Sequence, residues 1–248
     1  MKPKSPQEIK IMRQAGHQLA VILNDLTKMV MPGVKTQEID AKAAEAMKKA
    51  GLQAVLLGYQ GYPASTCISV NEQVVHGIPG KTVIQDGDVV KIDVTAAKDG
   101  LVVDTATTVV AGQAALEVKK LLEGTQRALY AGIDAIKGDG TKVGDISAAV
   151  EDVLNDYKLG IVRDLVGHGV GYGVHEMPNV PNYGSAGSGP KLSAGITIAV
   201  EPMATLGDWQ VGTLRDGWTI ITQDGSLAAH FEHTVAVTEN GYEILTQL

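Results

Sequence analysis

Two aspartates flank a predicted turn in the first half of the chain, and their spacing could bring two carboxylates together. Residues 89–95 and 101–110 are rich in β-branched side chains and enclose Lys98-Asp99-Gly100, which is typical of a β-hairpin. With the turn centred on Lys98-Asp99, Asp93 lies directly across from Asp104, with Cβ atoms roughly 5 Å apart. Two carboxylates that close repel each other unless one is protonated or a cation lies between them. A register displaced by one residue would instead put them on opposite faces of the sheet.

A glycine-rich segment in the second half carries a histidine near each end: Gly167-His168-Gly169-Val170-Gly171-Tyr172-Gly173-Val174-His175. Glycines at alternate positions do not suit a stable helix and favour an extended backbone lying close to another part of the molecule. The spacing resembles a dinucleotide-binding loop, but no helix signal follows it. A zincin helix is excluded, because no second histidine follows His175-Glu176 at the required distance. Taken alone, each histidine is better explained as a hydrogen-bonded structural residue.

Two glutamates lie in otherwise apolar predicted strands. Glu201 follows Ile198-Ala199-Val200, and Glu232 stands between Phe231 and the strand around residues 234–237. A glutamate in such a strand faces solvent, forms an ion pair or binds a metal. Taken singly, each glutamate is explained by exposure to solvent.

Taken together, the four carboxylates and one histidine make a five-ligand set dominated by hard oxygen donors. Such a set suits two divalent ions about 3.5–4 Å apart and bridged by carboxylates, as in aminopeptidase-type sites. Ions placed this way lower the pKa of water enough to yield hydroxide near neutral pH, and they stabilise a tetrahedral intermediate. The sequence therefore predicts a dinuclear hydrolytic site.

The elements that must position these residues begin with two helices. Ser5 is a good N-cap, Pro6 occupies the first helical position, and Glu8 completes a capping box ahead of an apolar pattern with helical spacing. Pro32-Gly33 is expected to end this helix. A second helix is expected from a cap at Thr36 to about residue 50.

A similar pattern returns about a hundred residues later, with helices predicted at 114–135 and 143–157. An offset of 107 residues aligns Gly33 with Gly140, Lys35 with Lys142, Ile39 with Ile146, Ala41 with Ala148 and Leu52 with Leu159. These identities are few, and chance agreement is the alternative. Because each half continues from a helix pair into β-rich sequence, we interpret the pattern as an internal pseudo-repeat. The predicted fold class is α+β, with two helix pairs packed on one antiparallel-rich sheet in a single domain, 1–248.

Composition sets further limits. The 248 residues are 44% hydrophobic and 20% charged, which is ordinary for a globular protein, and the formal charge of −7 argues against a broad nucleic-acid-binding face. The one cysteine, Cys67, excludes an internal disulfide and a cysteine-rich zinc module. No signal peptide or membrane span is recognisable, so a cytoplasmic location without membrane contact is expected.

The order of several short motifs resembles the type I methionine aminopeptidases over nearly the whole chain. The motifs are Val75-His76-Gly77-Ile78-Pro79, Lys91-Ile92-Asp93-Val94, Asp104-Thr105, Gly167-His168-Gly169-Val170-Gly171, Val200-Glu201-Pro202-Met203 and Phe231-Glu232-His233-Thr234. Each motif alone is weak, and their order and spacing are specific.

The resemblance implies the pita-bread α+β fold, in which two related halves enclose a metal site. It implies two divalent ions (manganese, cobalt, iron or zinc), with Asp104 and Glu232 as bridging ligands and Glu201 as the acid/base that moves the proton of the attacking water. The implied ligands are Asp93, Asp104, His168, Glu201 and Glu232. His76 and His175 would contact the substrate and stabilise the developing oxyanion without binding metal.

The resemblance also places a methionine pocket. Its implied wall consists of Tyr59, Tyr62, Cys67, His76 and Trp218. Cys67 as a nucleophile would need an activating histidine, and a wall position is the stronger reading, because sulfur and aromatic rings pack well against a thioether. Val174 departs from the aromatic residue that usually precedes the second histidine, which predicts a slightly wider pocket mouth and more tolerance of other residues.

The expected activity is removal of the initiator methionine from nascent polypeptides when the second residue is small. The chain lacks the N-terminal domain of creatinase and proline-dipeptidase relatives, so a bacterial-style type I catalytic domain is expected. An aminopeptidase acting before proline and a non-catalytic binding module of the same fold are the alternatives. A monomer is expected, with transient ribosome contact as a possible partner interaction.

Overall fold

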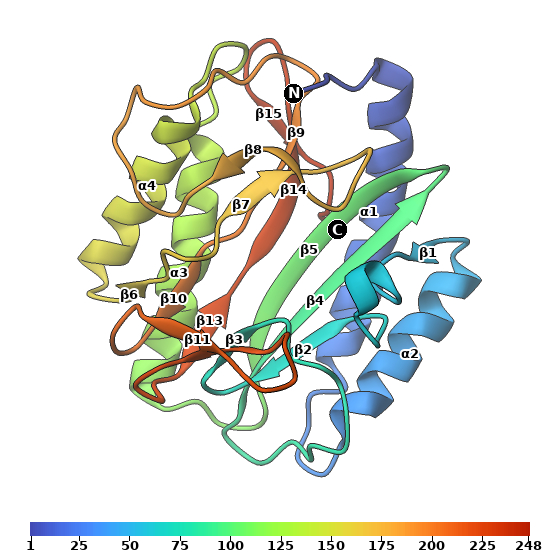
Figure 1. Ribbon diagram of the computed structural model, residues 1–248, viewed down its shortest axis with the longest axis vertical. Helices are drawn as coiled ribbons and strands as arrows, with labels where there is room; N and C mark the ends of the chain where they lie inside the picture. Colours follow the sequence, from blue (N-terminus) through green and yellow to red (C-terminus); the bar gives the residue numbers. More distant parts are fainter.

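Nine strands form the central sheet, which draws on both halves of the chain. The computed structural model describes residues 1–248 (Figure 1). The strands are β1 (Gln53–Ala54), β2 (Cys67–Val70), β4 (Val89–Lys98), β5 (Leu101–Val110), β7 (Gly167–Gly169), β8 (Glu176–Val180), β9 (Thr197–Val200), β14 (Glu232–Val237) and β15 (Tyr242–Ile244). Their order is β1-β4-β5-β14-β9-β7-β8, with β2 added to β4 and β15 added to β14, and every pairing is antiparallel.

Two smaller sheets of three strands each adjoin the central one. The first has the order β13 (Ala228–His230), β10 (Met203–Thr205) and β6 (Gly160–Ile161). The second has the order β11 (Val211–Thr213), β12 (Ile220–Thr222) and β3 (Gln73–Val75). A short 3-10 helix, η1 (Tyr59–Gly61), precedes β2.

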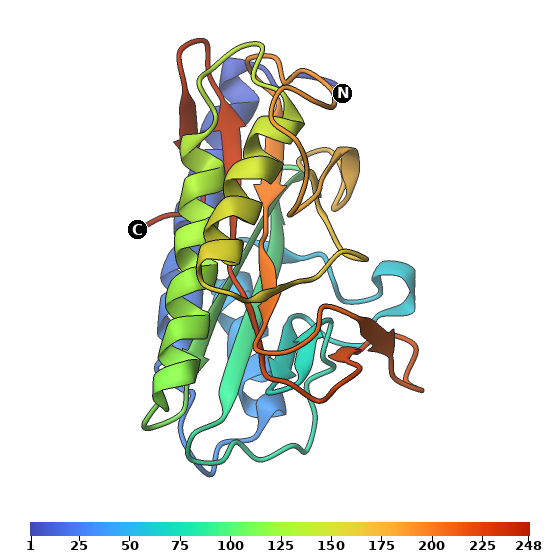
Figure 2. The same ribbon diagram turned by 90° about the vertical axis from the view of Figure 1, so that its left-hand side faces the viewer.

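Four helices cover one face of the sheet, α1 (Pro6–Thr27) and α2 (Thr36–Lys49) over one half and α3 (Leu116–Asp134) and α4 (Val143–Asp156) over the other. Figure 2 shows them on one side, with η1 and the small sheet of β11 and β12 on the other. An apolar core of 23 buried residues lies under the first pair, and one of 21 lies under the second. No helix is long and apolar enough to cross a membrane.

Three details of the first helix pair test the sequence expectations. The capping box of Ser5 and Glu8 is confirmed. The expected stop at Pro32-Gly33 is wrong, because α1 ends at Thr27 and a turn intervenes. The expected cap at Thr36 is also wrong: Lys35 is the N-cap, and the Thr36 hydroxyl instead accepts a 2.8 Å hydrogen bond from the Gly80 N–H.

The internal repeat is confirmed in the geometry of the elements. Adding 107 to the bounds of α2 and β1 gives the bounds of α4 and β6, and the last residues of α1 and α3 are also 107 apart. Both second helices begin at a lysine N-cap, Lys35 and Lys142, whose backbone N–H donates to the carboxylate of the acidic residue three positions on. The central sheet has the symmetric order β4-β5-β14-β9. The strands β5 and β14 pair at the centre, and β4 and β9 flank them. The fold is therefore the predicted α+β arrangement of two related halves.

The register of the β4–β5 hairpin differs from the prediction by two residues. Lys98 pairs with Leu101, so Asp93 faces Ala106 and Asp104 faces Thr95. Asp93 and Asp104 are consequently diagonal neighbours instead of direct partners. They still share one face, because side chains alternate with a period of two and a shift of two residues preserves the face. The alternation places Val90, Ile92 and Val94 in the core under the helices.

Candidate metal centre

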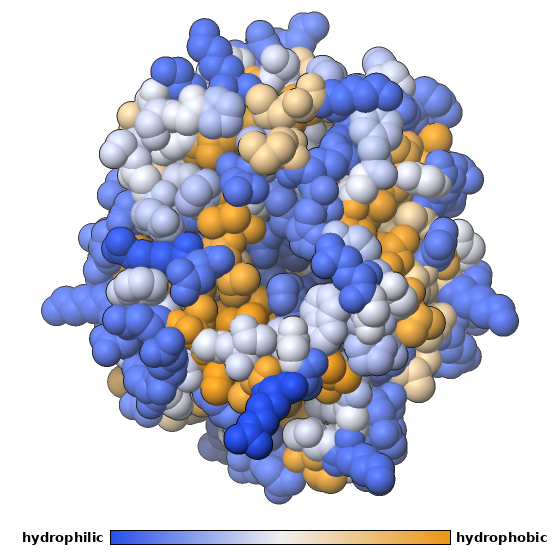
Figure 3. Space-filling model, viewed as in Figure 1, coloured by the Kyte–Doolittle hydropathy of each residue, from blue (hydrophilic) through white to orange (hydrophobic).

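The five side chains predicted as metal ligands line one cavity on the face of the sheet opposite the helices. The cavity has a volume of about 250 Å³, and Figure 3 shows a hollow near the middle of this face. The predicted ligands Asp93, Asp104, His168, Glu201 and Glu232 all line it. They come from β4, β5, β7, the break after β9, and β14, so strands from both halves meet at this point.

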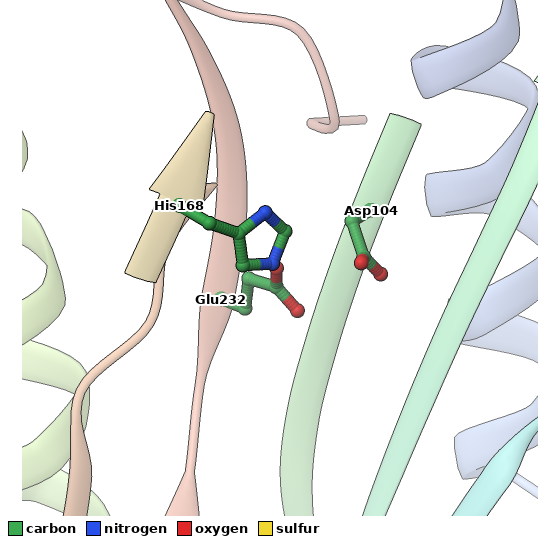
Figure 4. Close-up of side chains that lie close together, drawn as sticks. All are labelled: Asp104, His168 and Glu232. Atoms are coloured by element: carbon green, nitrogen blue, oxygen red, sulfur yellow. The ribbon is translucent and has the colours of Figure 1, made fainter. Parts of the chain in front are cut away.

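Three of these residues approach most closely. One ligand atom from each of Asp104, His168 and Glu232 lies within 4.8 Å of the others, and all three residues are buried. Figure 4 shows the three side chains pointing toward one another from β5, β7 and β14. Asp104 and Glu232 lie on neighbouring central strands, which joins the two halves of the chain at the ligand cluster.

The carboxylate of Glu201 lies between two histidines. Nε2 of His168 is 3.3 Å from one of its oxygens, and Nε2 of His230 is 3.5 Å from the other. Glu201 immediately follows β9 and precedes Pro202, where the strand breaks off. Because proline has no N–H to donate, the backbone leaves the ladder here, and the glutamate side chain lies at the end of the strand.

Hydrogen bonds from the surrounding strands hold the aspartate and glutamate backbones. Oγ1 of Thr234 accepts a bond from the Asp104 N–H and donates one to the Asp104 carbonyl, both at 2.8 Å. The Thr95 hydroxyl donates to a carboxylate oxygen of Asp104 at 2.8 Å, and the Thr105 hydroxyl donates to the Glu232 carbonyl at 2.8 Å. The cluster is therefore built on a rigid ladder.

The protonation equilibria of the cluster are strongly displaced. Burial, followed by repulsion from Asp104, raises the pKa of Asp93 well above its usual value. The same two causes raise the pKa of Glu201 and Glu232 well above the ordinary range. Burial raises the pKa of Asp104 to about 6, partly offset by the hydrogen bond from Thr95. Burial also lowers the pKa of His168 to about 4, which keeps its imidazole neutral and able to ligate.

The residues present fit divalent cations. Oδ1 of Asp93 and Oε1 of Glu232 are buried and have no hydrogen-bond partner within the protein. Buried acceptors without partners are rare, and four clustered carboxylates are stable in ionised form only beside a compensating charge. Carboxylate oxygens and a neutral imidazole are suitable ligands for first-row divalent metals.

Glycine is required on both sides of His168. A Cβ atom at Gly167 would lie 2.5 Å from the Ala199 carbonyl oxygen, and one at Gly169 would lie 2.4 Å from the Met177 carbonyl oxygen. The glycines thus let β7 lie against its neighbours while His168 projects into the cavity. The sequence expectation of an extended backbone in close approach is confirmed here.

The two other predicted histidines, His76 and His175, also line the cavity. Burial, then the charge of His175, lowers the pKa of His76 to about 4. His76 has a φ of 59°, a left-handed conformation that is uncommon for a non-glycine residue and is often found at functional sites. The imidazole of His175 lies with its ring centroid 4.4 Å from that of His168, and its Nδ1 is 3.0 Å from the Tyr59 hydroxyl.

The predicted pocket wall is only partly at the cavity surface. Cys67 lines the cavity and packs in one cluster with Tyr62 and Trp218, whose rings meet edge to face at 5.1 Å. Tyr59, Tyr62 and Trp218 are not among the lining residues, although Tyr59 bonds to His175 and the ring centroid of Trp218 lies 6.5 Å from that of His76. Val174 is buried and lines the cavity beside His175.

Three polar residues near the cluster were absent from the predicted site. His230 is buried, and neither ring nitrogen has a hydrogen-bond partner. Thr95 is two residues from Asp93, and the fully buried Lys91 donates to the carbonyl oxygens of Asn71 and Val89. Alternation along β4 could have identified Lys91 and Thr95, because residues two apart from Asp93 share its face. A histidine inside the apolar segment before Glu232 was the available signal for His230.

Comparison with known proteins decides the family. Residues 10–239 match the model of metallopeptidase family M24. The chain belongs to metallopeptidase family M24. It is 43% identical to methionine aminopeptidase 1 of Bacillus subtilis (strain 168), across 99% of this chain and 98% of that protein.

Two solved structures share the fold of this chain. Its structure is similar to that of methionine aminopeptidase from Thermotoga maritima, with a TM-score of 0.98, 42% identity and complete coverage of both chains. It is also similar to prolidase from Pyrococcus furiosus, with a TM-score of 0.79 and 23% identity, across 99% of this chain and 65% of that one. At that identity the second likeness shows the fold alone. The pita-bread fold of the M24 family is thereby confirmed.

Proposed function

We propose that this protein is a metal-dependent aminopeptidase that releases the N-terminal methionine of polypeptides. One observation carries the proposal: four carboxylates, two of them on buried residues, and His168 meet at a cavity whose wall also includes Cys67, Val75 and Met203. Carboxylates at one end suit metal-assisted hydrolysis, and sulfur and aliphatic groups suit a thioether side chain. The M24 match and the similarity to proteins named methionine aminopeptidase support the same activity.

We propose that the cluster would hold two divalent ions through Asp93, Asp104, His168, Glu201 and Glu232. Asp104 and Glu232 lie on neighbouring central strands, a position from which both could contribute to either ion. Manganese, cobalt, iron and zinc all accept this mixture of oxygen and nitrogen ligands.

The protein side chains supply orientation and proton transfer. Glu201 would accept a proton from the attacking water and pass it to the leaving amine. His76 and His175 would donate hydrogen bonds to the substrate carbonyl as negative charge develops there. When bound, the divalent ions supply Lewis acidity that makes hydroxide available and stabilises that charge.

For substrate selection, we assign the methionine side chain to the region of Cys67 and His76, with Tyr59, Tyr62 and Trp218 supporting the wall. Val174 would leave the mouth wider than an aromatic residue does, and so permit slow release of other residues. A small second residue is expected to be required. We place the activity on nascent polypeptides in the cytoplasm, carried out by residues 1–248 as one monomeric catalytic domain, with any ribosome contact transient.

The test compares release of the first residue from Met-Ala-Ser, Leu-Ala-Ser and Ala-Pro-Ser. The protein is assayed after chelation and again after addition of Mn²⁺ or Co²⁺. Methionine release that depends on metal, and that is lost in Asp104→Asn and Glu232→Gln, is the expected result. Preference for Ala-Pro-Ser would identify an aminopeptidase acting before proline. Folded protein without turnover under any condition would favour a binding module.

A further inference from the structure

The glycine-rich loop between β7 and β8 carries two residues of the cavity wall, Val174 and His175, yet it has little rigidity of its own. Gly171 and Gly173 lie within it, and Gly171 has a φ of 137°, a conformation that favours glycine. Glycine-rich backbone loses much conformational entropy when it is ordered. A single position for His175 therefore requires contacts from outside the loop.

The N-terminal segment supplies those contacts. The side chain of Lys4 is 1% exposed, and its Nζ lies 2.9 Å from Oε2 of Glu176. The other carboxylate oxygen of Glu176 accepts a 2.9 Å hydrogen bond from the Gly173 N–H. Glu176 thus joins Lys4 to the backbone of the loop, one residue after His175.

The Lys4 side chain lies directly against the backbone of the loop at Gly171. A Cβ atom at Gly171 would lie 2.3 Å from Cε of Lys4. Nζ of Lys4 is also 4.7 Å from the centroid of the Tyr172 ring, within cation–π distance. The Lys4 N–H donates to the Gly195 carbonyl at 2.8 Å, which fixes the segment just before α1 begins. Figure 1 shows the N-terminus at the end of the sheet where β7 and β8 meet.

A buried ammonium group needs a specific partner, because removing the charge from water is costly. An apolar side chain of the same length would fill the space next to Gly171 without that cost. The charge at Lys4 is therefore explained by its ion pair with the carboxylate of Glu176.

We propose that Lys4 is a positioning residue for His175. Through Glu176 it holds the glycine-rich loop in the conformation that directs His175 into the cavity. The inference rests on the proposed role of His175 in binding the substrate carbonyl, and it assigns to the N-terminal segment a part in catalysis that its sequence does not suggest.

The first test uses Lys4→Met and Glu176→Gln, with Lys10→Met on the exposed side of α1 as the matched control. Glutamine keeps the acceptor for the Gly173 N–H and removes only the charge. With Mn²⁺ and Met-Ala-Ser, kcat per folded molecule should fall about 10–100-fold in both variants, the size expected for a small misplacement of an active group. KM should change little, because the lost interaction is made in the transition state. Unchanged kcat in Glu176→Gln would overturn the proposal even if Lys4→Met does not fold.

The second test is a double-mutant cycle with His175→Ala. If Lys4 acts through His175, Lys4→Met should cost nothing further in that background. Equal losses in both backgrounds would overturn the inference and leave the role of His175 standing. No loss of kcat in His175→Ala alone would instead overturn the proposed role of His175, and the inference with it. Hydrogen exchange of residues 170–176 should speed up in Lys4→Met and not in Lys10→Met. Unchanged exchange in both variants would count against the proposed role of Lys4.

Discussion

In the proposed mechanism, Glu201 would be both a metal ligand and the general base. Its two oxygens face His168 and His230 at 3.3 and 3.5 Å, so the carboxylate is restricted on both sides. Burial and the charges of Asp104 and Asp93 raise its pKa, which makes it a stronger base than a solvent-exposed glutamate. Its position and its basicity both come from neighbours that are distant in the sequence.

Replacement by an isosteric amide separates these two roles. In Glu201→Gln we expect kcat to fall by about 10²–10⁴-fold, the usual contribution of a general acid/base. One oxygen remains available, so much of the metal content should be retained. Kinetics with Met-Ala-Ser and elemental analysis of the same sample test this. Full activity in the variant would exclude Glu201 as the acid/base.

Cys67 illustrates a residue whose reactivity is suppressed by its surroundings. Burial, then the charge of Asp93, raises the pKa of the thiol well above its usual value. The protonated sulfur is then a small apolar group in the cavity wall.

We therefore expect Cys67→Ala to keep kcat within about threefold and to raise KM for methionine peptides about three- to tenfold, since roughly one buried apolar contact is lost. The native thiol should also resist iodoacetamide at pH 8 and react after denaturation. Loss of kcat comparable to that of Glu201→Gln would contradict a wall role.

At the scale of elements, the β5–β14 pair connects the two halves at the proposed metal ligands Asp104 and Glu232. Asp104 and Thr234 are 130 residues apart and exchange two hydrogen bonds through one hydroxyl. The hydroxyl satisfies an N–H and a carbonyl that are both buried. The joint between the halves and the geometry of the metal ligands therefore depend on the same contact.

Thr234→Val keeps the shape and removes both hydrogen bonds. Leaving buried backbone groups without partners should cost about 1–3 kcal/mol, which corresponds to a fall in Tm of roughly 2–12 °C for a chain of this size. Affinity for Mn²⁺ should fall as well, because Asp104 is less firmly held. Thr107→Val, on the other face of β5, is the control for the substitution itself. Equal melting curves for the two variants would contradict a stabilising role for the contact between Thr234 and Asp104.

At the scale of the whole molecule, the buried carboxylates link metal binding to stability and pH. Without metal, their pKa values lie above the ordinary values of 3.8 and 4.5. Their contribution to stability is therefore present below those ordinary values and is lost as the pH rises through the folded-state pKa. The pKa values of His168 and His230 are lowered, so these histidines reduce the stability of the folded protein as the pH falls below about 6.5.

Comparing metal-loaded with metal-free protein at each pH isolates the carboxylates. Metal binding displaces their protons, so stabilisation by Mn²⁺ should grow between pH 5.5 and 7.5. At a free concentration 100 times Kd the gain is about 2.7 kcal/mol, or roughly 5–10 °C in Tm. Calorimetry with and without Mn²⁺ measures it, and Asp104→Asn should show a smaller gain. A gain that is independent of pH would argue against ligation by these carboxylates.

The sequence by itself determined the elements and the chemical type of the site. Apolar periodicity indicated the helices, and the capping box of Ser5 and Glu8 marked the start of the first, because these signals act within a few residues along the chain. The offset of 107 residues identified the repeat, and the residue types of Asp93, Asp104, His168, Glu201 and Glu232 indicated a hydrolytic metal centre.

Only the tertiary structure decided how those elements meet. The hairpin turns at Asp99-Gly100 and not at the predicted Lys98-Asp99, and the resulting two-residue shift kept both aspartates on one face. His230 and Lys4 gained their significance from partners 29 and 172 positions away, Glu201 and Glu176. Such contacts depend on how the two halves and the N-terminal segment pack, and local sequence signals carry no information about packing over these distances.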